Sequence, residues 1–488
     1  MKRTALLALL TLLAFTAPAK TITGKVLVDG KPRPDVVVSD GINVVTTDDK
    51  GRYTMDSEHR QHVFVSVPAD CEIPLDAQGQ PLFYQEIDTT SVKTQKINFN
   101  LKGSEKKSDW TLLVLADVQI GYDKDYTDLR DSVMPLLVDS VKLLPAPVYA
   151  ISLGDIVWNN PDFYTNYRKE LSKIGVPIFS VIGNHDHNEI TQGDSMSDLE
   201  FRNAMGPTYY SVNIGDCHIV ALDDIIYRGY TRRGDYTCGI TQQQIDWLKQ
   251  DLKHVPKSKT LVIGLHAPTA YRWGHPNIEN AEKLYDLVKD FNDVQILSGH
   301  THNNFTTTIA PNITETTHGA VNGAFWYPIC NDGSPRGHGV MRFEGSKLAD
   351  KYYKGFDTPR EYQIRMYEPS EAVLCKPNAK KGDKFKKILV NVFGWHTDWK
   401  VEVSENGKDW VELTTADRVS RPAVDPGVVM LINPATGYLS ANHGGSHAAK
   451  YNDHMFLYKP SKGWKKVRAR ATDPFGHVYT AELVRTAN

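Results

Sequence analysis

The chain has 488 residues, of which 41% are hydrophobic and 23% are charged, as in ordinary globular proteins of several domains. Its net charge of -2 gives no basic footprint, so the composition does not predict nucleic acid as a partner. After the N-terminus, no apolar stretch is long enough for a transmembrane helix. The five cysteines lack metal-site spacing, and a Cys217–Cys238 disulfide and buried free thiols are both open.

Residues 1–19 have the features of a signal peptide. Lys2 and Arg3 precede an apolar run over residues 5–15, and Ala17-Pro18-Ala19 has the form of a cleavage site. The lack of a cysteine near that site argues against a bacterial lipid anchor. We therefore expect an exported protein, periplasmic or secreted, whose mature chain begins near Lys20.

Residues 20–103 predict a small β-sandwich. Short β-branched runs alternate with turns such as Asp29-Gly30 and Asp40-Gly41, which is typical of this architecture. The pattern resembles the carboxypeptidase-regulatory-like modules of exported bacterial proteins. Asp48 is expected to form an Asx-type turn and not a calcium site. A short charged linker follows, over residues 103–108.

Residues 109–345 alternate apolar runs with helical patterns, which predicts an α/β domain. The apolar runs scarcely alternate with polar residues, as expected of strands that are buried on both faces. Thr241 is predicted to cap a helix whose apolar face includes Ile245 and Leu248. A second helix is predicted from the spacing of Leu284 and Val288.

Residues 360–488 predict a second β domain. The expected strands cover residues 387–393, 400–404, 410–414 and 478–484. Asn406-Gly407 is a strong hairpin signal between two of them. Trp395, Trp399 and Trp410 suit a sugar-stacking face, but core packing is the use that we expect.

Polar side chains that can bind metals follow the apolar runs of the α/β domain. They are Asp117, Gln119, Asp155, Asn184, His266, His300 and His302. Each alone has an ordinary alternative, such as a helix cap, a turn or a core histidine. Because polar groups at the carboxyl ends of buried strands gather at one edge of a sheet, we expect them to form one site. Carboxylates, amides and imidazoles together suit two divalent ions, either manganese, iron or zinc, with Asp155 as the bridge.

The order Asp-x-Gln, Gly-Asp, Gly-Asn-His-Asp, His and Gly-His-x-His, over residues 117–302, resembles the calcineurin-like metallophosphoesterase superfamily. The flanking β domains resemble those of an exported, three-domain bacterial subgroup of Bacteroidetes type. The resemblance implies two packed β-sheets flanked by helices. It also implies one metal held by Asp117, Gln119, Asp155 and His302, and another held by Asp155, Asn184, His266 and His300. His185 would be the acid, with Asp186 behind it.

Gln119 departs from this resemblance, because the commonest motif of the family has histidine there. An amide oxygen is a harder and weaker donor than an imidazole, which leaves the occupancy and identity of the first metal open. Related branches resemble this chain in having Asp-x-Gln. Gln119 is therefore expected to be a ligand and not the mark of a broken site.

The function expected is that of an exported dinuclear metal-dependent phosphoesterase, which hydrolyses phosphate mono- or diesters through a metal-bound hydroxide. The substrate would be a small-molecule or glycan phosphate ester, and the oligomeric state is left open. Arg336, Asp332 and His275 are candidate substrate contacts, with ordinary surface roles as the alternative. Two other functions remain: a catalytically weak, metal-containing glycan-binding protein, and a nucleotide or pyrophosphate hydrolase on the same fold.

Overall fold

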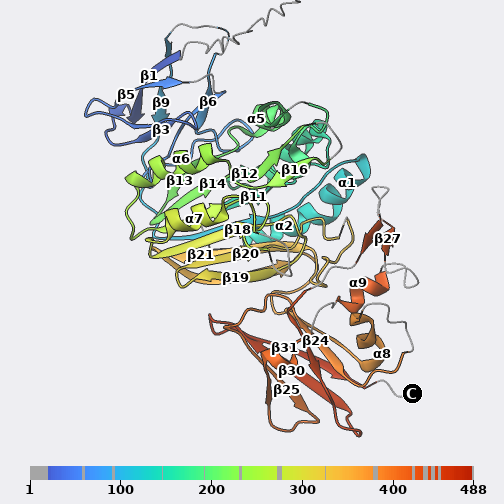
Figure 1. Cartoon of the computed structure of the whole chain (residues 1–488). Helices are drawn as coiled ribbons and strands as arrows, with labels where there is room; N and C mark the ends of the chain where they lie inside the picture. Colours follow the sequence, from blue (N-terminus) through green and yellow to red (C-terminus); the bar gives the residue numbers. More distant parts are fainter. Residues whose placement is uncertain are drawn as a thin grey trace, which may run out of the picture.

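The computed structural model describes residues 20–57, 61–88, 90, 94–145, 147–191, 193–229, 234–271, 277–324, 326–376, 383–419, 424–431, 438–440, 446–448 and 452–485. Three parts follow one another along the chain: an N-terminal β part, a central α/β part and a C-terminal β part (Figure 1). Within the described residues, no helix is both long and apolar enough to cross a membrane. All five cysteines lie among them and are free thiols, so Cys217 and Cys238 are not joined.

The N-terminal part consists of two small sheets. The first contains β1 (Lys20–Val28), β2 (Lys31–Pro32), β5 (Arg52–Ser57), β8 (Gln95–Lys96) and β9 (Phe99–Leu101). The second contains β3 (Val37–Ser39), β4 (Val44–Thr46), β6 (His62–Val65) and β7 (Tyr84–Glu86). The side chains of Ile22, Val38 and Phe64 are fully or almost fully buried in the core that these sheets share with the central part. Asp48 forms the expected Asx-type turn, since its carboxylate accepts the backbone N–H groups of Lys50 and Arg52.

The central part contains two sheets that pack face to face. The first, in spatial order, is β12 (Ile178–Val181), β11 (Val148–Leu153), β10 (Asp109–Leu115), β21 (Gly337–Glu344) and β22 (Lys347–Gly355). The second is β13 (Tyr210–Ile214), β14 (Cys217–Ala221), β17 (Thr260–Gly264), β18 (Asp293–Ser298), β20 (Ile313–Thr317) and β19 (Phe305–Ala310). A Cβ atom on Gly264 would lie only 2.5 Å from Ile151 Cδ1, so β17 and β11 are in close contact.

Helices cover the outer faces of both sheets. On the first sheet they are α1 (Asp123–Asp128), α2 (Met134–Lys142), α3 (Tyr164–Leu171) and α5 (Leu199–Met205), and on the second α6 (Gln242–Asp251) and α7 (Ala281–Val288). The short helix α4 (Asp194–Ser197) contacts α5. In β10, Leu113 and Leu115 join the core cluster that contains residues of α2 and α3, whereas Leu112 and Val114 join the cluster of the second sheet. Burial on both faces thus explains why the strand reads as a continuous apolar run. Thr241 caps α6 as expected, because its hydroxyl accepts the Gln244 backbone N–H.

The C-terminal part also contains two sheets. One has β23 (Ile364–Tyr367), β24 (Ile388–Val392) and β29 (Met455–Tyr458), and the other has β26 (Val411–Leu413), β25 (Lys400–Glu405), β30 (Lys466–Thr472) and β31 (Val478–Val484). Smaller elements elsewhere are the pairs β15 (Ile225–Tyr227) with β16 (Tyr236–Cys238) and β27 (Tyr438–Ser440) with β28 (Ser446–Ala448), and the helices α8 (Pro369–Ala372) and α9 (Pro426–Leu431). Asn406 and Gly407 both have positive φ, at 52° and 78°, as the predicted hairpin turn requires.

Buried polar contacts attach both β parts to the central part. On the N-terminal side, Trp247 Nε1 of α6 donates to Ser39 Oγ at 3.0 Å. On the C-terminal side, Asn391 Nδ2 of β24 donates to the carbonyl oxygen of Asp332 at 2.9 Å. Because polar groups are buried only at a cost unless they are paired, these contacts fix how the parts are joined.

Candidate metal centre

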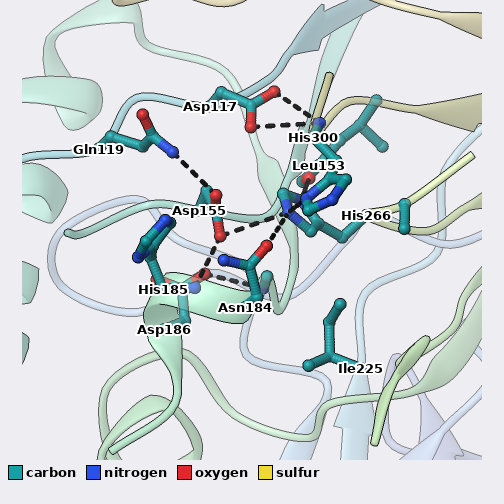
Figure 2. Close-up of polar contacts among 12 residues, drawn as sticks. Asp117, Gln119, Leu153, Asp155, Asn184, His185, Asp186, Ile225, His266 and His300 are labelled. Carbon is teal, nitrogen blue, oxygen red and sulfur yellow. Dashed lines mark hydrogen bonds and ion pairs between the residues drawn. The ribbon is translucent and has the colours of Figure 1, made fainter. Parts of the chain in front are cut away.

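The seven side chains that the sequence predicts as metal ligands meet at strand ends of the two sheets. Figure 2 labels all of them except His302. The first sheet supplies those after β10, β11 and β12, and the second sheet supplies those after β17 and β18. Asp117 and Gln119 follow β10, Asp155 follows β11 and Asn184 follows β12. His266 follows β17, and His300 and His302 follow β18. Six of these seven are buried, and His300 is half-buried. The predicted clustering at one sheet edge is therefore what the fold produces.

Unusual backbone conformations aim these side chains into the site. Asp117, Gln119, Asp155, His300 and His302 all have positive φ, between 50° and 65°. A residue other than glycine in this region costs on the order of 1–3 kcal/mol and persists only where its surroundings impose it. Five such residues among seven candidate ligands therefore indicate that backbone strain is concentrated at a functional site.

Two glycines allow the loops to approach one another. A Cβ atom on Gly183 would lie 2.2 Å from the backbone nitrogen of Asp155, and one on Gly154 would lie 2.7 Å from His266 Nδ1. Both distances are shorter than any ordinary contact. The glycines before Asp155 and Asn184 are thus required because the loops after β11, β12 and β17 touch.

Asp155 lies at the middle of the cluster. Its Oδ2 accepts from Gln119 Nε2 at 2.9 Å, and its Oδ1 accepts the backbone N–H of His185 at 2.8 Å. His266 Nε2 lies 3.3 Å from the same Oδ1. Ligand atoms of Asp155, His266 and His300 lie within 4.8 Å of one another, which fits a metal site with Asp155 at its centre.

The histidines present their Nε2 or Nδ1 atoms to the site in the form that metals require. His266 Nδ1 donates to the carbonyl of Leu153 at 2.8 Å, and His302 Nδ1 donates to that of Gly323 at 2.7 Å. These bonds occupy Nδ1 of each ring, so Nε2 is the nitrogen that faces the site and can bind a metal once it is deprotonated. His266 Nε2 lies 3.0 Å from His300 Nδ1, so the two rings would be able to hold the same ion.

The electrostatics of the cluster also favour a cation. Burial disfavours an imidazolium at His266, yet the Asp155 carboxylate outweighs it and raises the pKa of His266 to about 10. Burial, together with the charge on His266, lowers the pKa of His300 to about 3. The carboxylates thus hold a proton at the centre of the site, and metal binding at such sites releases protons. The donor set therefore fits divalent metal ions.

The amide oxygen of Gln119 does not face the site in this structure, as the oxygen of a metal ligand would. Its Oε1 accepts from Asn322 Nδ2 at 2.7 Å, while its Nε2 donates to Asp155. Metal coordination needs the amide oxygen to face the site, which requires the Gln119 amide to turn over. Asn322 can follow such a turn, since its own buried Oδ1 has no hydrogen-bond partner in the described residues. The assignment of Gln119 as a ligand stays a prediction.

His185, the predicted acid, is held by two neighbours. Its Nδ1 lies 2.8 Å from Asn159 Oδ1, and its ring stacks on Trp158 with 3.8 Å between the ring centroids. Since Nδ1 donates to the amide oxygen, Nε2 is the nitrogen that is left for proton transfer. Burial lowers the pKa of His185, although the Asp155 carboxylate opposes this shift.

Asp186 does not stand behind His185, which corrects the arrangement expected from the sequence. Its carboxylate instead accepts the backbone N–H groups of Ile156 and Gly183, at 3.1 and 2.9 Å, and the hydroxyl of Tyr164. Burial and the nearby Asp155 raise the pKa of Asp186 to about 7. Asp186 therefore fastens the loop of Asp155 to that of Asn184 and does not orient the imidazole.

Three residues of the site were not predicted in their roles. Asn159 orients His185, Asn322 contacts Gln119, and Asp224 accepts the backbone N–H groups of His266 and Ala267 at 2.9 and 2.8 Å. Their only signal in the sequence is a polar residue in or near a strand-end loop. Such residues are common in turns, so the signal is too weak to single them out.

The predicted substrate contacts fare differently from the metal ligands. Asp332 is fully buried and accepts the Asn304 backbone N–H, so its role is structural and the prediction of a substrate contact is wrong. Arg336 is 7% exposed and already pairs with Asp128 at 2.7 Å, so its contact with a phosphate stays a prediction. His275 lies outside the described residues.

Family models match nearly the whole chain after residue 19. The N-terminal domain of calcineurin-like phosphoesterases matches residues 20–104, the calcineurin-like phosphoesterase model matches residues 111–304, and the C-terminal domain matches residues 315–479. The chain belongs to the calcineurin-like metallophosphoesterases. The expected family and fold class are thereby confirmed, whereas the Bacteroidetes-type subgroup stays a prediction.

Individual relatives of this metallophosphoesterase are distant. A protein named "Probable glycerophosphodiester phosphodiesterase GpdQ", from Arcobacter nitrofigilis, is 25% identical over 197 residues, which are 39% of this chain and 68% of that protein. A dimetal phosphatase structure from Danio rerio is 16% identical, with 51% and 99% of the two chains covered and a TM-score of 0.36. A purple acid phosphatase from yellow lupin seeds is 12% identical, with 66% and 69% covered and a TM-score of 0.37.

As a calcineurin-like metallophosphoesterase, the protein is a metal-dependent hydrolase of phosphoric esters with a centre for two divalent ions. When bound, two such ions supply a water nucleophile at neutral pH and neutralise charge on the phosphoryl oxygens. The residues that would hold them are the seven predicted ligands. Asp186 and Asp224 position the ligand loops through their hydrogen bonds to backbone N–H groups. The role of His185 as the acid stays a prediction.

Proposed function

We propose that the protein is an exported phosphodiesterase that releases an alcohol from a phosphate diester, with His185 as the proton donor. The position of His185 carries this proposal. Its backbone N–H donates to Asp155 Oδ1, and its ring is fixed by Asn159 and Trp158. An acid that is held beside the centre of a two-metal site serves an oxygen leaving group that needs a proton.

A cavity of about 230 Å³ that adjoins His185 supports a particular kind of leaving group. Glu189 and Glu200 line this cavity, and Glu200 Oε1 accepts from Asn188 Nδ2 at 2.8 Å. Carboxylates repel an anionic leaving group such as a phosphate, and they tolerate a neutral or cationic alcohol. The cavity thus favours esters that release a neutral or cationic alcohol over pyrophosphate linkages, whose leaving group is an anion. A phosphodiester is in line with the name of the relative from Arcobacter nitrofigilis.

We also propose that residues 1–19 are removed and that the mature protein works in the periplasm or outside the cell. Its domains would be residues 20–103, 109–345 and 360–488, and its ions manganese, iron or zinc. Support comes from the sequence of residues 1–19, and from the N-terminal family model, which begins at residue 20. The intact mass of protein recovered from the cell envelope tests this, and retention of residues 1–19 would contradict it.

Turnover by the manganese-loaded enzyme tests the substrate class. Glycerophosphocholine offers a cationic leaving alcohol, glycerol 3-phosphate is the matched monoester, and pyrophosphate has an anionic leaving group. We expect kcat/KM to be highest for glycerophosphocholine. Glu200→Gln should reduce that preference, because it removes a negative charge from the cavity. Faster turnover of pyrophosphate than of the diester would contradict the proposal.

A further inference from the structure

A second cavity, of about 340 Å³, lies where the central part meets the C-terminal part. It is bounded by the β19–β20 hairpin, by β22 and by segments of the C-terminal sheets, which lie side by side in Figure 1. None of the seven predicted metal ligands, all within the described residues, lines this cavity. We refer to it as the interdomain cavity, and its volume falls within the roughly 300–1,000 Å³ of small-molecule sites.

One wall of the interdomain cavity is a patch of hydroxyl groups. Thr306 lies opposite Thr316 and Thr308 lies opposite Thr314 in the antiparallel pair β19–β20, and all four line the cavity. Residues two apart on a strand point to the same face, so the four side chains share one surface. Each hydroxyl can both donate and accept a hydrogen bond, which suits a ligand rich in hydroxyl groups.

A cation lies beside this patch. Lys351 Nζ, from β22, donates to Thr316 Oγ1 at 3.0 Å and forms no ion pair with a carboxylate of the described residues. Asp398 also lines the cavity, but its carboxylate accepts from His396 Nδ1 at 2.7 Å. Burial lowers the pKa of Lys351 to about 8, although Asp398 and Asp293 oppose the shift from a distance. An ammonium group has three donors, and buried charges are normally paired. Lys351 is half-buried at the wall of the interdomain cavity, where its remaining donors can bind an anionic group.

Aromatic rings of the C-terminal part form the opposite wall. Trp399 and Phe475 line the cavity, and Trp399 stacks on Tyr479 with 5.8 Å between the ring centroids. His396 Nε2 lies 3.1 Å from Thr308 Oγ1, which links the aromatic wall to the threonine patch. A site with flat apolar rings on one side and hydroxyl groups on the other presents the two surfaces that a sugar ring can use.

We propose that the interdomain cavity binds a monosaccharide-sized molecule that carries one anionic group. The anionic group pairs with Lys351, the ligand's hydroxyls bond to the threonine patch, and the ring packs against Trp399. A free acidic sugar and a terminal acidic unit of a glycan share this chemistry. The site involves residues outside the metal centre, so it does not depend on the proposed phosphodiesterase activity.

Calorimetric titration of the metal-loaded full-length protein with three probes tests this proposal. Glucuronate carries both the ring and the anion, glucose carries the ring alone, and sulfate carries the anion alone. We expect glucuronate to bind at least about tenfold more tightly than glucose or sulfate. Lys351→Met should weaken glucuronate binding by at least about tenfold, whereas Lys347→Met, at an exposed position on the same strand, should leave it unchanged.

Controls separate the possible outcomes. A probe that binds at the metal centre should bind equally well to both lysine variants. Only a loss of binding that is specific to Lys351→Met therefore reports binding in the interdomain cavity. If that variant fails to fold, Thr314→Val with Thr316→Val should produce the same loss by removing two hydroxyls. Equal glucuronate binding in wild type and variants, or no binding at about 10 mM, would overturn the proposal. If sulfate bound through Lys351 as tightly as glucuronate does, the sugar ring would add nothing to binding, and the proposal of a sugar ligand would be refuted.

Discussion

The imidazole Nδ1 of His185 lies 2.8 Å from Asn159 Oδ1, and this contact joins the loop after β12 to the loop after β11. The contact explains how a histidine outside the metal ligand set is held beside Asp155. An amide oxygen orients the ring without adding a negative charge next to the metal ligands. His185 is thus available as an acid whose direction is fixed by an uncharged neighbour.

Asn159→Ala should slow the hydrolysis of esters with poor leaving groups while leaving the bound metal unchanged. His185 then loses its orienting partner, and we expect a loss of about tenfold to a hundredfold in kcat, below the full contribution of a general acid. His185→Asn, which removes the acid itself, should cost about a hundredfold or more. Steady-state kinetics with alkyl and nitrophenyl diesters, together with metal analysis, check this.

Nitrophenolate leaves without much need of a proton, so both variants should retain more activity on the nitrophenyl diester. Equal losses on the two leaving-group classes would remove His185 and Asn159 from acid catalysis. A loss of metal in either variant would instead show that the substituted residue contributes to metal binding.

Gln119→Ala should weaken one metal ion selectively if the amide oxygen of Gln119 is a ligand. The second ion keeps Asn184, His266 and His300, so activity should recover in part at high manganese by mass action. Gln119→His should bind metal at least as well and shift preference toward zinc or iron, which imidazole suits better than an amide does. Metal content and preference that are identical in all three proteins would show that Gln119 is not a ligand.

Acid should destabilise the central part through two buried histidines that are remote from the metal ligands in sequence. Burial lowers the pKa of His318 and of His338 to about 3, and the described residues offer no partner to either ring nitrogen of His338. A folded pKa below the unfolded value of about 6.5 means that the unfolded chain binds more protons in between. Stability is therefore full above about pH 6.5 and is lost as pH falls toward 3.

His338→Leu should reduce this acid sensitivity. At pH 5 the wild-type residue costs about 2 kcal/mol relative to pH 7, so the drop in the unfolding midpoint from pH 7 to pH 5 should be smaller in the variant. Thermal unfolding at both pH values measures this. His254→Leu, at an exposed position, is the matched control and should keep the wild-type drop. An unchanged drop in His338→Leu would show that this histidine is not responsible.

The sequence indicates the metal ligands because each follows an apolar run that forms a buried strand. The strand ends then bring Asp117, Asp155 and His266 together without further information. The residues behind the ligands could not be found in this way. Asp186 follows His185 directly, but the 3₁₀ turn over Asn184–Asp186 sends its carboxylate to the backbone of Ile156.

Asn159 shows the opposite case, since it is distant from His185 in sequence and reaches it only because two loops meet. Asp332 illustrates a further limit. It lies in a turn-rich segment typical of surface loops, yet the C-terminal part covers it, and Asn391 and Asn452 donate to its carbonyl oxygen. Burial by another domain leaves no local mark in the sequence, so the expected substrate contact was wrong.

Metal content and turnover measured on the same samples test the central claim most directly. Purified protein supplied with manganese should hold two ions per chain and hydrolyse a bis-aryl phosphate. Chelation should remove both ions and the activity, and added manganese should restore both. Asp155→Ala should lose metal and activity together, because this carboxylate lies at the middle of the site. Full activity in chelated protein without bound metal would contradict the account.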